Sequence, residues 1–568
     1  MQAGFEREVM RGRQIVERTA MSQERRYRQV RQATAWTEAT ATNNRASKET
    51  ASEVLAEPGA PVDGCGAGPD VLKPKRLYAR VAGRDSAARL LSDEDLAELE
   101  DPMAAVFFRN KVFPLTVQDL LAALPANATE SRRVYLVSEA GQFSAPGLQR
   151  VVRSVFTMRV FTRDVDLLVA TQATGEPEDV FLQVAAWDDK ARHFNFYIRL
   201  QHAWVWAGNS WDSLEPGSRG MGCFDSHVNG SVVMKELKVP WLNWHSQRAK
   251  IHFEPQDPIR SDPLYKQGHV DQAEGLELTV KDLVRRWTEA RLAKVTSSND
   301  IEHPRHLLRQ LLTTTTVNLA STEIASLSID RSDPPLIVPM GFWLNSDALV
   351  NILGLDISAS RPALPAGAYL DSRTRFGMHL REGDFRQSGD AFFAFVCPEA
   401  AFEDNEVVGQ MVSSGLISAR FAACCLMVDF FNPVFSSARP QLMRHVPHLP
   451  TPKGALEDTI VRAIASSDCA DDSPEKQFMD CWQVSEGEWK SVFAKRLDTY
   501  LGRVAEHALT QEGCDDYMRL AESRRRQFRS RPLNEFSLTA PFTDTPPNAP
   551  LLAMREDGTT TPLTPTDR

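Results

Sequence analysis

The chain has 568 residues and a formal net charge of -10, from 65 lysines and arginines against 75 aspartates and glutamates. This balance excludes bulk attraction to nucleic acid or to an anionic membrane, because phosphate binding depends on clustered basic charge. No apolar run reaches the roughly 20 residues that span a bilayer, and the N-terminus lacks the basic-then-apolar plan of a secretory signal. We therefore expect a cytoplasmic chain of about two to four domains that binds neither nucleic acid nor membrane.

The first 75 residues differ in composition from the rest of the chain. Residues 1–35 carry many arginines mixed with glutamates and have only a thin apolar stripe, which predicts a helix that is exposed or that depends on a protein partner. Residues 37–75 are rich in Ala, Thr, Gly and Pro, and such a segment buries too little apolar surface to offset its ordering entropy. The sequence thus predicts an arginine-rich helix and a flexible linker over 1–75.

An α+β domain is expected over 76–275, and it begins with helices. Ser92 and Thr116 each precede a helical pattern, and a hydroxyl at the N-cap accepts a hydrogen bond from an otherwise unpaired N–H. A third helix is predicted after Pro146, where apolar residues follow the helical period: Leu148, Val151, Val152, Val155 and Phe156.

Four strands are expected next, over 165–171, 180–187, 193–200 and the stretch HAWVWAGNSW that begins at His202. Their side chains alternate with a period of two, and residues 188–192 are typical of a hairpin loop. In the last stretch His202, Trp204 and Trp206 share one face. The pattern predicts a small antiparallel sheet with an aromatic side in the central region.

Residues 276–530 are predicted to form a mainly helical domain. Thr279 is expected to cap a helix over 280–295, and further helices are expected over 306–320, 417–431 and 455–527. The tail over 531–568 is rich in Pro and Thr, shows no sustained period, and is predicted to be disordered. The fold class is therefore α+β, with a small central antiparallel sheet and a mainly helical C-terminal part.

One short string in the central segment indicates a cofactor. Cys223, Ser226 and His227 match the C-x-x-C-H haem-attachment motif, except that serine replaces the second cysteine. In c-type cytochromes the two thiols add to the haem vinyl groups and the histidine binds iron. Serine cannot form a thioether, so at most one covalent link can form here. Together with the aromatic sheet before it, the string resembles cytochromes of the P460 type.

This resemblance implies a haem or a related tetrapyrrole. His227 would be its proximal ligand and Cys223 its single covalent link, while His202 or His245 would bind from the opposite side. Trp206, one of several clustered tryptophans, would contact the ring, since large aromatic side chains suit a small flat ligand. Such a site favours redox chemistry. The family is exported and receives its haem outside the cytoplasm, and neither an export signal nor the second cysteine is found in this sequence.

Other interpretations remain open. Aromatic residues with alternating spacing also form the core side of a sheet, and a cysteine four residues before a histidine arises easily by chance. Two pairs of histidines, at 303 and 306 and at 445 and 448, lack a recognisable third metal ligand, and Cys397 is interpreted as a buried thiol. Phosphate-loop, nucleophile-elbow and zinc-protease motifs are absent. The sequence leaves undecided whether the chain is an enzyme, and the alternative is a non-enzymatic binding or scaffold protein with a vestigial site.

Overall fold

The computed structural model describes residues 72–138, 152–172, 181–200, 202–225, 227–234, 244–246, 251, 256, 258–266, 270–319, 329–379, 381–382, 385–386, 392–467, 469–530 and 542–563. Two compact units divide the chain. Met1–Val134 with Arg153–Gly230 form one, here the sheet unit, and Tyr135–Val152 with Ser231–Arg568 form the other, here the helical unit. The predicted N-terminal helix, and the predicted linker as far as residue 71, lie outside the described residues.

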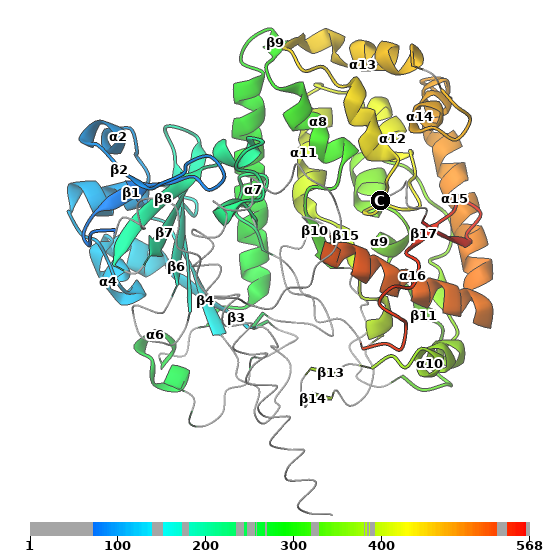
Figure 1. Ribbon diagram of the computed structural model, residues 1–568, viewed down its shortest axis with the longest axis horizontal. Helices are drawn as coiled ribbons and strands as arrows, with labels where there is room; N and C mark the ends of the chain where they lie inside the picture. The colour runs from blue at the N-terminus through cyan, green and yellow to red at the C-terminus, as the bar shows by residue number, and fades with distance from the viewer. Residues whose placement is uncertain are drawn as a thin grey trace, which may run out of the picture. The chain divides into compact units, whose positions relative to one another are not determined.

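Seven strands of an eight-stranded sheet belong mainly to the sheet unit (Figure 1), whereas residues 135–138 of the eighth, β3, are assigned to the helical unit. Its order is β2-β1-β8-β7-β6-β5-β4-β3, with β1 parallel to β8 and the pairs from β8 to β4 antiparallel. The strands are β1 (Leu77–Ala79), β2 (Arg89–Leu90), β3 (Arg133–Ser138), β4 (Val152–Met158), β5 (Leu167–Gln172), β6 (Leu182–Asp188), β7 (His193–Leu200) and β8 (Ala203–Asn209). The α+β class is confirmed, whereas the sheet is larger than predicted and mixed rather than purely antiparallel. Strands β1 to β4 are additional to the four predicted, and β1 and β2 are too short to show a period in the sequence.

The segment after Pro146 contains a strand in place of the predicted helix. Along β4, Val152, Ser154, Phe156 and Met158 are buried while Arg153 is exposed, which is the two-residue period of a strand. The apolar residues of this segment also fit a helical spacing, but β4 pairs with β5 from residue 153 to residue 158. The apolar spacing is compatible with a helix or a strand, and pairing with β5 favours the strand.

Short helices accompany this sheet: α2 (Asp93–Ala97), α3 (Pro102–Ala104), α4 (Val117–Ala123) and α5 (Ala126–Ser131), with a π-helical turn η2 (Ala105–Arg109) after α3. Both predicted N-caps are confirmed, and Ser92 and Thr116 each form a capping box with the aspartate three residues later. Phe107 of η2 packs on Trp204 and Tyr197, with ring centroids 5.2 and 5.7 Å apart. One face of the sheet is thus covered by the segment that follows α2.

Helices dominate the helical unit, as the sequence predicts. They are α6 (Pro263–Lys266), α7 (Ala273–Val295), α8 (Pro304–Leu312), α9 (Met340–Trp343), α10 (Ala366–Arg375), α11 (Phe402–Ser413), α12 (Ala419–Leu426), α13 (Leu456–Ala465), α14 (Pro474–Trp482), α15 (Trp489–Ala508) and α16 (Gln511–Ser530), with the π-helical turn η6 (Asp347–Ile352). Short strand pairs join them: β9 (Asp300–Ile301) with β16 (Thr451–Pro452), β10 (Val317–Leu319) with β15 (Pro398–Ala400), β11 (Leu336–Ile337) with β12 (Ala363–Leu364), and β13 (Arg381–Glu382) with β14 (Phe385–Arg386). Within the described ranges, no helix combines the length and hydrophobicity needed to cross a membrane.

Three predicted helix boundaries are wrong. α7 begins at Ala273, and Thr279 lies inside it, where its hydroxyl donates to the Gly275 carbonyl one turn earlier. α8 ends at Leu312, because the run of threonines that follows extends into β10. α12 ends at Leu426 and is followed by turns.

Part of the C-terminal tail is folded, which corrects the prediction of disorder for residues 542–563. Strands β17 (Leu552–Met554) and β18 (Thr560–Pro562) form an antiparallel hairpin, and β17 lies against α16. The side chains of Leu552 and Met554 are buried, with 5% and 1% of their surface exposed. The tail's composition predicts disorder for an isolated segment, but its partners come from elsewhere in the chain.

Candidate functional site

Cys223 and His227 share one turn in the sheet unit. The backbone N–H of His227 donates to the Cys223 carbonyl at 3.2 Å, just after the 3-10 helix η4 (Gly222–Asp225). The imidazole of His227 packs on the ring of Phe196 in β7, with centroids 4.9 Å apart, and Phe224 contacts the same ring at 5.7 Å. Ser226 lies outside the described residues. His227 thus takes part in the aromatic packing on this face of the sheet.

Trp206 lies on the opposite face of the sheet from His227. It stands opposite Tyr197 in the β7–β8 pair, and the neighbouring residue Phe196, on which His227 packs, points to the other side. Its indole N–H donates to Asn195 Oδ1 at 2.9 Å. The alternation of side chains along β7 therefore separates two residues that the sequence predicted to share a site.

The structure describes both proposed opposite ligands, His202 and His245. His202 is exposed and follows the end of β7. Leu200, the last residue of β7, lies about 13 Å along the strand from Phe196, at roughly 3.3 Å per residue. His245 belongs to the helical unit, where its N–H donates to the Leu136 carbonyl at 2.9 Å. Across the described part of the chain, no three His, Cys, Asp or Glu residues are grouped so as to hold a metal ion. Cys223 and His227 are the two residues of the predicted haem site that one turn brings together.

The sheet unit contains a buried carboxylate that the sequence analysis did not single out. Asp101 caps α3, and one of its oxygens accepts the N–H groups of Met103 and Ala104 at 2.8 and 3.1 Å. The other accepts the Asn195 amide at 2.8 Å and the Tyr197 hydroxyl at 2.6 Å. Burial raises the pKa of Asp101 to about 6 and that of Tyr197 well above its ordinary value. With four donors inside the protein, Asp101 has a structural role.

A second buried carboxylate organises the helical unit. Asp404 accepts the backbone N–H groups of Thr315 and Thr316 at 2.9 and 3.4 Å, and the Gln310 amide at 3.2 Å. Gln310 in turn accepts a hydrogen bond from Arg291 at 2.6 Å. Burial raises the pKa of Asp404 to about 6. This network fixes the turn between α8 and β10 against α11.

Two neighbouring hollows, each of about 540 Å³, run along α7 and α11, and both are lined by Glu289, Gln410 and Ser413. The two cations that line them are already engaged. Arg285 pairs with Glu406 at 3.4 Å, and Lys453 donates to the Thr296 carbonyl. No feature of this lining identifies a class of ligand.

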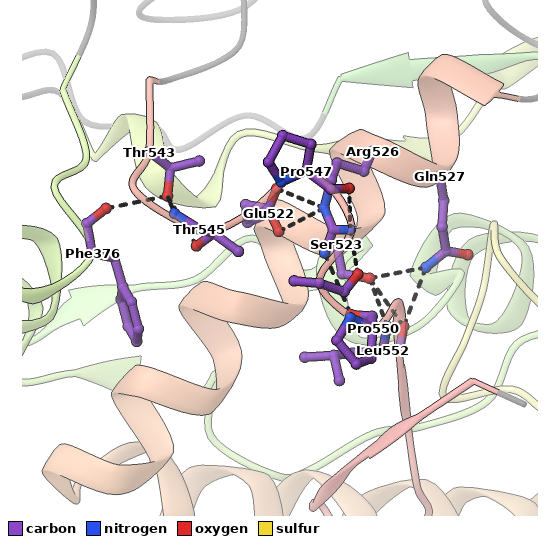
Figure 2. Close-up of polar contacts among 11 residues, drawn as sticks. Phe376, Glu522, Ser523, Arg526, Gln527, Thr543, Thr545, Pro547, Pro550 and Leu552 are labelled. Atoms are coloured by element: carbon purple, nitrogen blue, oxygen red, sulfur yellow. Dashed lines mark hydrogen bonds and ion pairs between the residues drawn. The ribbon is translucent and has the colours of Figure 1, made fainter.

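A set of polar side chains holds the described part of the C-terminal tail. We call it the tail groove and define it by Asn432, which follows α12, and by Ser523, Arg526 and Gln527 of α16. The N–H of Leu552 donates to Ser523 Oγ at 2.7 Å, and its carbonyl accepts from Gln527 at 3.2 Å (Figure 2). Two residues later, the N–H of Met554 donates to Asn432 Oδ1 at 2.9 Å and its carbonyl accepts from Asn432 Nδ2 at 3.0 Å. Both main-chain groups of both residues are therefore satisfied by side chains.

These side chains take the place of a neighbouring strand. The other edge of β17 pairs with β18, as shown by the hydrogen bonds from Arg555 to Thr559 at 2.8 Å and from Leu563 to Leu551 at 2.7 Å. In an antiparallel pair, alternate residues direct their main-chain groups to opposite edges. Leu552 and Met554 therefore present theirs to the groove.

Arg526 extends the groove toward the proline-rich part of the tail. Its guanidinium donates to the carbonyls of Ala549 at 2.6 Å, Pro547 at 3.3 Å and Pro550 at 3.4 Å, while Glu522 accepts from its Nε at 2.8 Å (Figure 2). Proline has no N–H, so a segment of this kind offers mainly carbonyl acceptors. A donor with several N–H groups is the matching partner.

Sequence reasoning missed the tail groove. Its one signal is the short apolar run LLAM, residues 551–554, inside a Pro- and Thr-rich tail. The string SRRRQ of α16 has the composition of a solvated face, yet Ser523 and Gln527 are buried. No family model matches this chain, and the searches of curated proteins and of solved structures find no match. Function is therefore argued from geometry.

Proposed function

We propose that this chain is a non-enzymatic binding protein whose tail groove takes up an extended peptide segment. The observation that supports the proposal is the pairing of both main-chain groups of Leu552 and of Met554 with side chains of the groove. Main-chain hydrogen bonds to an added strand are a recurring mode of peptide recognition, in which pockets for alternate side chains add specificity. In the chain as it folds, its own C-terminal segment occupies the groove.

Because the tail is part of the same chain, it competes with any free peptide for the groove. A segment linked to its site by a short connection acts at an effective concentration on the order of millimolar. A free peptide of equal affinity therefore binds poorly until the tether is cut or the resident segment leaves. The tethered tail would thus raise the concentration of free peptide that is needed for binding.

Peptide exchange after cutting the tether tests this proposal. The full chain would carry a protease-cleavage sequence between residues 535 and 536, and binding of a fluorescent peptide spanning 546–563 would be measured by anisotropy before and after cleavage. We expect the cleaved protein to bind the peptide about 100-fold more tightly than the intact chain, because cleavage removes the tethered competitor.

The control is the same peptide with N-methyl groups on Leu552 and Met554, which lacks the two N–H donors that the groove pairs. We expect it to bind at least about tenfold more weakly. If the cleaved chain exchanges neither peptide, the segment is a fixed part of the fold and the proposal fails.

Haem binding at Cys223 and His227 stays a prediction on a narrower basis. The shared turn of these two residues supports it, whereas Trp206 and His227 lie on opposite faces of the sheet. If haem binds there, protein expressed with haem supplied shows a Soret band that the substitution His227→Ala removes. The absence of a band from the folded protein would contradict the haem hypothesis.

A further inference from the structure

The tail groove continues into a site for a carboxylate. Arg496 of α15 donates from Nε and Nη2 to the two oxygens of Glu556, at 2.6 and 2.7 Å. Its guanidinium also lies 5.1 Å from the ring centroid of Phe430 and 3.8 Å from the Cys481 sulfur. Two parallel N–H···O bonds are the geometry with which arginine recognises a carboxylate. Contacts outside the tail therefore help to hold this guanidinium in position.

Two residues after Glu556, the structure restricts which residue type can occupy position 558. Tyr517 donates from its hydroxyl to the Gly558 carbonyl at 2.8 Å. Gly558 has a φ of +86°, and a Cβ atom there would lie 3.2 Å from the Val504 nitrogen. Both the backbone conformation and the close approach to α15 favour glycine.

The spacing of the recognised residues defines a pattern. Leu552 and Met554 supply buried apolar side chains at the first and third positions, Glu556 supplies the carboxylate at the fifth, and Gly558 stands at the seventh. The main-chain hydrogen bonds of the groove are available to any extended segment, so they do not distinguish one sequence from another. Discrimination must come from the side-chain positions.

We propose that the partner of the tail groove is a hairpin or extended segment of another protein that carries this pattern, apolar-x-apolar-x-acidic-x-Gly. Arg496 determines its specificity. The inference rests on the proposed function, and residues 552–558 are the resident copy of the pattern. Arg496 and Glu556 retain 30% and 38% of their side-chain exposure, so water weakens their attraction and we expect about a tenfold preference for the acidic residue.

Competition among peptides on the cleaved full chain tests the pattern. Peptides spanning 546–563 would carry the native sequence, Glu556→Gln, Glu556→Lys or Gly558→Ala. We expect Glu556→Gln to weaken binding about tenfold, and Glu556→Lys and Gly558→Ala to weaken it by at least as much. In the protein variant Arg496→Glu the preference should reverse, so that the lysine peptide binds better than the native one.

Lys495→Glu is the matched control, because it makes the same change of charge at an exposed neighbouring position of α15. It should leave the order of the peptides unchanged. A purely structural role of Arg496 would lower all affinities without reversing the preference. Equal binding of the native and Glu556→Gln peptides would overturn the specificity inference while leaving the proposed function standing, whereas failure of every peptide to exchange would overturn both. The peptide series needs no substitution at Arg496, so it tests the pattern even if the variant Arg496→Glu does not fold.

Discussion

Replacing Asn432 with alanine is expected to release the tail and to speed hydrogen exchange in residues 552–562 about a hundredfold. Asn432 is 5% exposed and pairs with both main-chain groups of Met554, which is 1% exposed. Alanine would leave a buried donor and a buried acceptor without partners, at a cost of about 3 kcal/mol. Since roughly 1.4 kcal/mol corresponds to a factor of ten, the population of the open tail should rise about a hundredfold. Hydrogen exchange followed by mass spectrometry measures this directly.

The same substitution also removes a 2.8 Å hydrogen bond from Asn432 to Asp429, so the effect on the tail must be separated from a general loss of stability. Exchange in α12 provides the internal reference. Asn351→Ala is the matched control, since that side chain is exposed and donates to Asp347 at 3.2 Å. Unchanged exchange in the tail of Asn432→Ala would show that the hydrogen bonds of Asn432 do not help to hold the segment.

The tail groove illustrates what local sequence patterns omit. Asn432 and Met554 are 122 residues apart, and neither lies in a pattern that indicates the other. Capping boxes at Ser92 and Thr116 were predictable because both partners lie within three residues. The strands β5 to β8 were predictable for a similar reason, since their alternation and their hairpin loop are local features.

The sequence could not show which residues of the predicted haem site share a face of the sheet. Its tryptophans and histidines are close together in the chain, but a strand directs successive side chains to opposite faces. Trp206 accordingly faces Asn195, whereas His227 packs on Phe196. The sequence-based prediction of β4 failed because its apolar spacing fits a helix as well as a strand and a distant partner decided between them.

Asp101 is expected to make the sheet unit less stable as the pH rises from 4 to 7. Its pKa in the folded chain is about 6, against an ordinary value of 3.8, because burial disfavours the charged form. Well below pH 3.8 the carboxyl is protonated in both states and does not change the free energy of unfolding. As the pH rises, the unfolded chain loses this proton first, so the free energy of unfolding falls by about 3 kcal/mol until the pH passes 6. The neighbouring Asp188 acts in the same direction, whereas the Tyr197 hydroxyl remains neutral and donates.

Asp101→Asn should remove this dependence. The variant carries no titrating group at this position, so its stability relative to the native chain should improve by about 3 kcal/mol between pH 4 and pH 7, whatever the mismatch of its amide with the Asn195 amide costs. Native-state hydrogen exchange of β7 amides, corrected for intrinsic rates, measures the slope. Asp404→Asn is the matched control, because Asp404 has a similar pKa but lies in the helical unit, so this change should flatten the slope in α11 and leave β7 unaffected. An unchanged slope in β7 of Asp101→Asn would mean that the four donors around the carboxylate stabilise its charged form as strongly as burial opposes it.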